Sequence, residues 1–200
     1  MPELAVQTPC IAEASDVPLL AASLAAAFAG YPLTEWVVLP DARRTRRRHA
    51  YFEIFLDHGV AHGEVLCPTD RSAAAIWYPP AGWNASLATL LARLPRLARV
   101  TGWRNLASRL TQLARLAAHH PDDPHWYLEV IGTRPDAQGR GTGGLLLEAG
   151  LARARADGVG AYLMTSSAAV IPFYSAHGFV VREEFAIRRG PTCWCLWHDR

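Results

Sequence analysis

Residues 130–144 read VIGTRPDAQGRGTGG, an apolar run that leads through a glycine-dense turn into a predicted helix. Glycines let backbone N–H groups converge, and a helix start adds unsatisfied N–H donors and the positive end of the helix dipole. The turn therefore predicts a site for a diphosphate group. No lysine is needed for this, and the chain has none, because all 20 of its basic residues are arginine.

Three glycines of the turn, Gly139, Gly141 and Gly144, also satisfy the G-x-G-x-x-G pattern of dinucleotide-binding folds. The context argues against a nicotinamide enzyme. Residues 134–138 separate these glycines from the strand, and Met164 and Thr165 stand where an acidic residue should end the next predicted strand. A nicotinamide-dependent enzyme stays as a weaker alternative. The chain has no G-K-[ST] sequence, which excludes an ATP-type phosphate loop.

The hydrophobic pattern predicts a mixed α/β domain. Apolar residues at helical spacing, bounded by Gly, Pro and Asp signals, predict helices at 16–30, 42–58, 87–119 with a break near Thr101-Gly102, 143–157 and 168–177. Apolar runs bounded by turn residues predict strands at 64–67, 73–78, 126–133, 161–165, 179–187 and 192–198. The strand, helix, strand succession after residue 126 predicts a right-handed parallel crossover. No repeat or linker divides the chain, so residues 1–200 are expected to form a single domain.

Composition narrows the class of protein. Half of the 200 residues are hydrophobic and the net charge is +2, so the chain can bury one core and has little surplus charge for a nucleic acid. No apolar run is long enough to span a membrane, and the first residues do not resemble a signal peptide. We expect a cytoplasmic monomer or homodimer that binds neither nucleic acid nor membranes. The cysteines and histidines lack metal-ligand spacing, so no metal is expected, and Cys193 and Cys195 are expected to be buried.

Two ordered motifs resemble the GNAT superfamily of acetyl-CoA-dependent N-acetyltransferases. Gln138, Gly141 and Gly143 occupy its Gln/Arg-x-x-Gly-x-Gly/Ala motif, and a second landmark, FY followed by GF at residues 173–174 and 178–179, lies at the expected distance downstream. The resemblance implies the GNAT fold, which has a central mixed, mostly antiparallel sheet of six to seven strands flanked by helices. It also implies acetyl-CoA as the acyl donor, bound in the cleft where two parallel strands splay.

The resemblance assigns the acetyl-CoA site to a strand end, the glycine turn and the start of the following helix. Ser167 stands where many members have an asparagine that contacts the donor, so that contact is expected to be weakened or replaced. The residues expected to bind acetyl-CoA are Ile131, Gly132, Thr133, Gln138, Gly139, Arg140, Gly141, Thr142, Gly143, Gly144 and Ser167.

Two side chains are expected to move protons. Tyr174 matches the family's general acid, which protonates the departing thiolate. Glu129 is our candidate base, because it lies in the apolar run WYLEVIG, two residues before Ile131 and on the same face of a regular strand. Desolvation would raise its pKa toward neutrality. A structural ion pair with an arginine is an equal alternative. A backbone N–H of residues 131–133 is expected to stabilise the oxyanion.

Aromatic residues outside these motifs suggest the acceptor pocket. Phe28, Tyr31, Trp36 and Trp126 are expected to line it, since large flat side chains suit an aromatic or amphipathic amine. Further stretches, including DVP at residues 16–18, resemble a branch of the family that acetylates an antibiotic. The sequence thus predicts N-acetylation of a small amine, such as an antibiotic or secondary metabolite. A peptide or protein amine as acceptor, or a CoA-binding sensor with little catalysis, remain alternatives.

Overall fold

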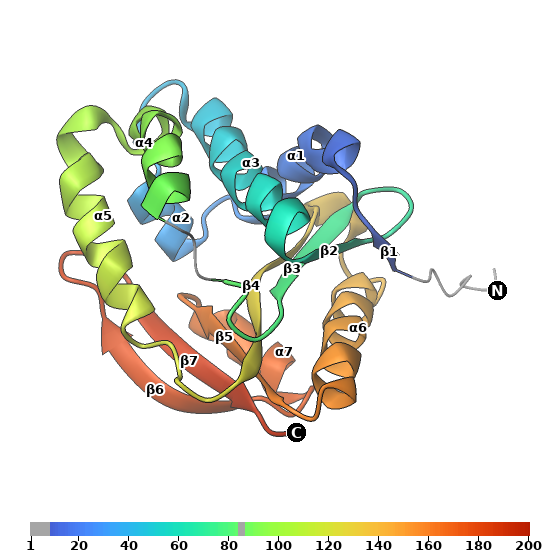
Figure 1. The fold of residues 1–200 in the computed structure, drawn as a ribbon. Helices are drawn as coiled ribbons and strands as arrows, with labels where there is room; N and C mark the ends of the chain where they lie inside the picture. The colour runs from blue at the N-terminus through green and yellow to red at the C-terminus, as the bar shows by residue number, and fades with distance from the viewer. Residues whose placement is uncertain (1–8, 84–86) are drawn as a thin grey trace.

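The computed structural model describes residues 9–83 and 87–200, and these form a seven-stranded sheet in the order β1-β2-β3-β4-β5-β7-β6 (Figure 1). β4 and β5 are parallel, and the other neighbours are antiparallel. The predicted mixed, mostly antiparallel sheet is confirmed. The strands are β1 Cys10–Ile11, β2 Glu64–Cys67, β3 Ala73–Tyr78, β4 His125–Thr133, β5 Gly160–Thr165, β6 Val180–Ala186 and β7 Thr192–His198.

Helices fill most of the connections between the strands. They are η1 Ala14–Asp16, α1 Val17–Ala27, α2 Pro32–Val37, α3 Arg44–His62, α4 Leu87–Thr101, α5 Trp103–Ala117, η2 Pro135–Ala137, α6 Thr142–Ala156, η3 Ala168–Val170 and α7 Ile171–Ser175. α6 is the predicted crossover between the parallel strands β4 and β5. None of the helices within residues 9–83 and 87–200 combines the length and apolar character needed to cross a bilayer.

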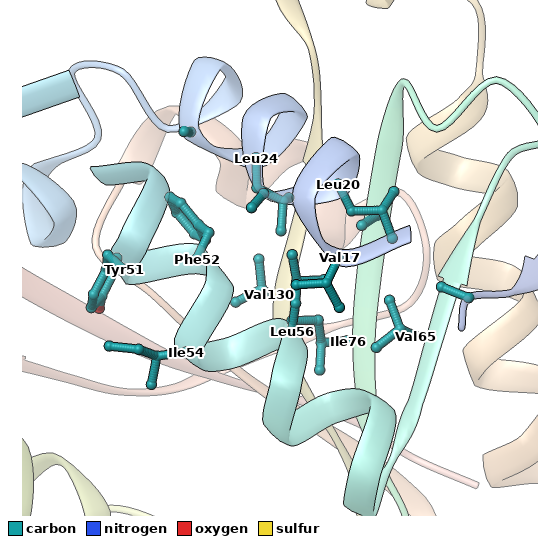
Figure 2. Close-up of a cluster of buried hydrophobic side chains, with 14 of the residues drawn as sticks. Val17, Leu20, Leu24, Tyr51, Phe52, Ile54, Leu56, Val65, Ile76 and Val130 are labelled. Atoms are coloured by element: carbon teal, nitrogen blue, oxygen red, sulfur yellow. The ribbon is translucent and has the colours of Figure 1, made fainter. Parts of the chain in front are cut away.

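Both faces of the sheet are covered. On one face α1 and α3 pack on β3 and β4 around a core that includes Leu20, Phe52 and Ile76 (Figure 2). On the other face α6 and α7 enclose a second core, which includes Trp77 and Leu147. Every residue of β3 is buried, because successive side chains of this central strand enter opposite cores. Figure 1 shows α5 descending toward β6 and β7, where Leu116 joins a third, smaller cluster.

Each predicted helix and strand has a counterpart in the structure, and two observed elements, α2 and β1, were not predicted. The break near Thr101-Gly102 is confirmed, since Gly102 has a φ of 77° between α4 and α5. α2 was not predicted, although Pro32 suits the first turn of a helix, because six residues carry little periodicity. β1 was not predicted, since two residues carry no periodicity. Cys193 and Cys195 are buried, as predicted.

Gly150 allows α6 to approach the sheet closely. A Cβ atom at this position would overlap the indole of Trp77, which is completely buried. We expect Gly150→Ala to lower the free energy of unfolding by about 1–3 kcal/mol, although alanine favours a helix more than glycine does. Urea unfolding would measure the change. The loss should shrink in a Trp77→Phe background, and an equal loss in both backgrounds would contradict this account of the contact.

Candidate active site

The parallel strands β4 and β5 separate halfway along their length. Their pairing runs from His125 opposite Gly160 to Leu128 opposite Leu163 and then stops, although β4 continues to Thr133. The backbone of residues 129–133 therefore has no β5 partner on that side. This splay creates a cleft between two strands that are held firmly at their other ends.

The loop between α1 and α2 is fixed to the open end of β5. The N–H of Ser166 donates to the Tyr31 hydroxyl oxygen at 2.8 Å, and that oxygen lies 2.9 Å from Thr165 Oγ1. The Ser166 hydroxyl in turn accepts a bond from the N–H of Leu33 at 2.9 Å. These bonds place Tyr31 at the cleft and satisfy backbone groups that have no strand partner there.

A β-bulge sets the direction of Glu129. Ile76 pairs with Val130 and Trp77 pairs with Leu128, so Glu129 is an extra residue in β4. The bulge reverses the alternation of side chains, because Val130 joins the core under α1 and α3 while Ile131 packs against the core under α6. The expectation that Glu129 and Ile131 share a face is therefore wrong. Glu129 instead lies among Tyr78, Tyr127 and other groups on the α3 side.

The glycine turn has the conformation that its sequence predicts. Gly139 and Gly141 have φ values of 77° and 78°, in the left-handed region, and α6 begins directly afterwards at Thr142. Gln138 donates from Nε2 to the Thr133 carbonyl at 2.9 Å, which ties the turn to the end of β4. The first N–H groups of α6 therefore face the open end of the splayed strands, without intrahelical partners.

A cavity of about 540 Å³ fills the cleft between β4, β5, the turn and α7. It brings together most of the residues predicted from the sequence. These are Phe28, Tyr31, Glu129, Ile131, Gly132, Thr133, Gln138, Gly139, Gly141, Thr142, Gly143, Gly144 and Tyr174.

Four predicted site residues do not line this cavity. Arg140 is exposed and donates to the Asp136 carbonyl at 3.1 Å, and Ser167 precedes η3 with its N–H directed to Thr165 Oγ1 at 3.3 Å. The acceptor-pocket expectation is corrected for Trp126, which is buried in the core under α6 and donates to Asp157 at 2.8 Å. Trp36 was also expected to line the acceptor pocket, but it lines neither this cavity nor the one next to it, and its Nε1 donates to the Arg189 carbonyl at 2.7 Å.

Tyr174 reaches the cavity from α7. The ring is 8% exposed and packs edge-on against Phe173 and Phe179. Burial raises the pKa of Tyr174 well above that of a phenol in water, and nearby Tyr31 adds to the rise. The hydroxyl is therefore fully protonated at neutral pH.

Glu129 is the most perturbed carboxyl group of the cleft. Burial raises its pKa to about 7, and this effect outweighs the lowering by the Tyr78 hydroxyl and by the positive charge of Arg93. Its Oε2 atom is buried and has no hydrogen-bond partner among the residues that the structure describes. A carboxyl group in this state changes its protonation near neutral pH, which is what a general base requires.

A second cavity, of about 230 Å³, adjoins the first. The two share a wall made of Phe28, Tyr31, Glu129, Val130 and Met164. The lining of the second cavity includes aromatic side chains of α3, which are Tyr51, Phe52 and Phe55, and aliphatic side chains of α5, which are Leu113, Leu116 and Ala117. Tyr51, Phe52 and Phe55 belong to the helix predicted at 42–58, but helical periodicity does not reveal which of its apolar residues face a cavity. His120 was not predicted at all, because no motif includes it.

A wider hollow, of about 790 Å³, lies at the opposite ends of β5 and β7. Its lining includes Arg182, Glu183 and Asp199 but none of the predicted site residues. Most residues of the predicted site therefore lie at the cleft between the splayed strands, and none lies at this wider hollow.

Comparison with known proteins agrees with this geometry. Residues 98–179 match the sequence model of the Acetyltransferase (GNAT) family. A Corynebacterium glutamicum structure, described as histone acetyltransferase HPA2 and related acetyltransferase, is 24% identical with a TM-score of 0.73, and the match covers 96% of each chain.

Two insect enzymes also share the fold. Polyamine N-acetyltransferase from Drosophila melanogaster is 16% identical, with a TM-score of 0.59 over 96% of this chain and 100% of that one. Arylalkylamine N-acetyltransferase 2 from Aedes aegypti is 13% identical, with a TM-score of 0.61 over 94% of this chain and 96% of that one. At these identities the structural likeness establishes the GNAT fold.

Residues 98–179 therefore match the sequence model of the GNAT family, and the chain has the GNAT fold.

Proposed function

We propose that the protein transfers an acetyl group from acetyl-CoA to the primary amine of a small molecule, by direct attack in a ternary complex. One observation carries the proposal. Glu129, with a pKa of about 7, stands on the wall shared by two cavities, one beside the glycine turn and Tyr174, the other lined by aromatic residues. An amine in the second cavity would then meet a thioester in the first at a group that can accept its proton.

The cleft fits the donor. The positive φ values of Gly139 and Gly141 and the free N–H groups at the start of α6 form a cradle for the diphosphate, whose charge they would stabilise. Acetyl-CoA supplies an activated acetyl group as a thioester. The unpaired edge of residues 131–133 offers N–H donors for the oxyanion that forms on attack. Gly132 is required here for packing, because a Cβ would approach Phe28 to 2.7 Å.

We assign the two proton transfers to Glu129 and Tyr174. Above pH 7 Glu129 is ionised and accepts a proton from the amine, and its raised pKa makes it a stronger base than an exposed carboxylate. Tyr174 donates its proton to the departing thiolate. Burial raises the pKa of this phenol, and the same desolvation makes a thiolate in the cavity more basic than in water, so the two remain matched.

We further propose an antibiotic or related secondary metabolite as the acceptor, with resistance or tailoring as the role. The chain resembles puromycin N-acetyltransferase at residues 16–18, 172–174 and 190–195. Where that enzyme has an acidic residue before Thr-Ser, this chain has Met164, and it has Glu129 in β4 instead. These are departures from that enzyme, with an acid absent at one position and present at another, and both positions line the wall between the cavities.

A thiol-release assay tests the proposed function. Acetyl-CoA is mixed with the protein and with one of three groups of acceptors: amine antibiotics, simple amines and peptides with a free N-terminus. We expect thiol release that depends on a small amine, together with the N-acetylated product by mass spectrometry. Acetyl-CoA binding in calorimetry without thiol release from any amine would instead establish a sensor. Release only with peptides would favour a peptide N-acetyltransferase.

Gly141 and Gly158 form a matched pair for testing the diphosphate cradle. Both have positive φ, at 78° and 68°, and an added Cβ would meet nothing within 4 Å at either position. Alanine at each should therefore cost a similar roughly 1–2 kcal/mol of unfolding free energy through backbone strain. Only Gly141 lines the cleft, so Gly141→Ala should weaken acetyl-CoA binding by about tenfold in calorimetry, while Gly158→Ala should not. Equal affinities for the two variants would contradict the proposed cradle.

A further inference from the structure

We propose that the acceptor is a primary amine that carries one positive charge and one aromatic ring, and that the ring occupies the second cavity. This inference rests on the proposed function and specifies the substrate class of the same site.

The lining of the second cavity favours a ring. Its aromatic members are Phe28, Tyr31, Tyr51, Phe52, Phe55, Trp83 and Tyr127. Several of them already pack in edge-on pairs, such as Phe28 with Tyr31 and Tyr51 with Phe55, both at 4.8 Å between ring centroids. A further ring gains both apolar burial and edge-on contacts in such surroundings.

The volume of the second cavity suits one aromatic ring. An apolar cavity of about 150 Å³ holds a benzene molecule. The second cavity, at about 230 Å³, therefore has room for a single ring with a short side chain. The amine at the end of that side chain would lie at the shared wall, beside Glu129.

The charges of the cavity select against a second cation. Glu129 is the only acidic residue among the described residues that line it. His120 also lines it, but burial lowers the pKa of His120 to about 3, so this ring is neutral and offers no negative or positive charge. A second ammonium or guanidinium group would lose its hydration without gaining a counter-charge, which costs several kcal/mol. The positive charge of Arg93, which acts on Glu129, adds to this penalty.

His120 forms part of the wall of the second cavity. Its imidazole stacks on Trp83 at 3.8 Å between centroids and lies edge-on to Tyr127 at 4.6 Å. Its Nε2 atom is buried and has no hydrogen-bond partner among the described residues. A ring bound in the cavity would pack beside this imidazole, so His120 is inferred to be a specificity-determining residue.

A matched series of amines tests the inference by thiol release. We expect kcat/KM for 2-phenylethylamine and tyramine to exceed that for putrescine and agmatine by about 100-fold, because the latter two carry a second cation. His120→Phe should change the ratio of kcat/KM for tyramine to that for 2-phenylethylamine, while thiol release with 2-phenylethylamine continues. Equal or faster release with putrescine or agmatine would overturn the inference and leave the proposed function intact. No release with any amine would overturn the proposed function itself.

A designed charge provides a second, independent measurement. Leu113 is a partly buried residue of α5 that lines the cavity, and Leu113→Glu would add the missing counter-charge. We expect this variant to gain activity with agmatine relative to 2-phenylethylamine. Leu19→Glu, at a position that is 62% exposed on α1, adds the same charge outside the cavity and should leave the preference unchanged. A folded Leu113→Glu variant with an unchanged preference would contradict the inference, and the wild-type series decides the matter if this variant does not fold.

Discussion

Glu129→Gln is expected to lower kcat/KM at neutral pH by about 100-fold to 1000-fold, the range usual for the loss of a general base. The amide has nearly the shape of the carboxyl group, so the cleft keeps its form while the proton acceptor is lost. Calorimetry should show unchanged affinity for acetyl-CoA. Glu148→Gln is the matched control, because Glu148 lies on the exposed side of α6, where it pairs with Arg155 at 3.3 Å.

The pH dependence of kcat/KM tests directly whether Glu129 is the base. Below its pKa of about 7 Glu129 is protonated and cannot accept a proton, so kcat/KM should rise with pH and level off above 7. Glu129→Gln should flatten this rise. A variant that keeps both the wild-type rate and the rise near pH 7 would exclude Glu129 as the base.

Stability measurements separate this effect from unfolding. The pKa of Glu129 is raised from 4.5 to about 7 on folding, so its contribution to stability is fully present below pH 4.5 and is lost as pH rises through 7. Glu129→Gln removes the cost of ionising a buried carboxyl group. The variant should therefore be more stable than the wild type at pH 8, even though it is less active.

Tyr174→Phe is expected to lower kcat by about 100-fold and to leave the affinity for acetyl-CoA within about twofold. The variant keeps the ring that packs against Phe179 and loses only the hydroxyl, so a large effect on turnover reports on proton donation. Since burial raises the pKa of Tyr174, the wild type should show no fall in rate up to pH 9 that is attributable to this phenol.

Tyr162→Phe serves as the control for Tyr174→Phe. Tyr162 is also a buried tyrosine, but its hydroxyl lies 3.1 Å from the Cys195 sulfur and does not line the cleft. This change should affect stability and spare turnover. Equal turnover in Tyr174→Phe and the wild type would assign the proton donor to another group.

Local signals account for the parts of the fold that could be predicted. The predicted strands at 64–67, 73–78 and 192–198 have the observed bounds, since each is a short apolar run closed by turn residues. The glycine turn was predictable because positive φ at two of its positions nearly requires glycine. These signals act within a few residues and do not depend on the rest of the chain.

The features that could not be predicted from the sequence depend on tertiary packing. The direction of Glu129 was predicted wrongly because period-two alternation assumes a regular strand, and a bulge shows only when β4 is paired with β3. Trp126 and Trp36 were predicted to line the pocket because a large flat side chain has the same sequence signal in a core as in a cavity. The second cavity forms between α3 and α5, which are far apart in the sequence, so no local pattern indicates it.

The extra residue in β4 also affects how the cleft of this protein could change during evolution. Glu129 has no partner residue in β3, so a substitution at this position leaves the strand pairing on either side of it unchanged. Acidic, amide or apolar side chains can therefore replace one another at position 129 during evolution with little loss of folding stability. Changes of catalytic pH range and of preferred amine would then begin at this single position.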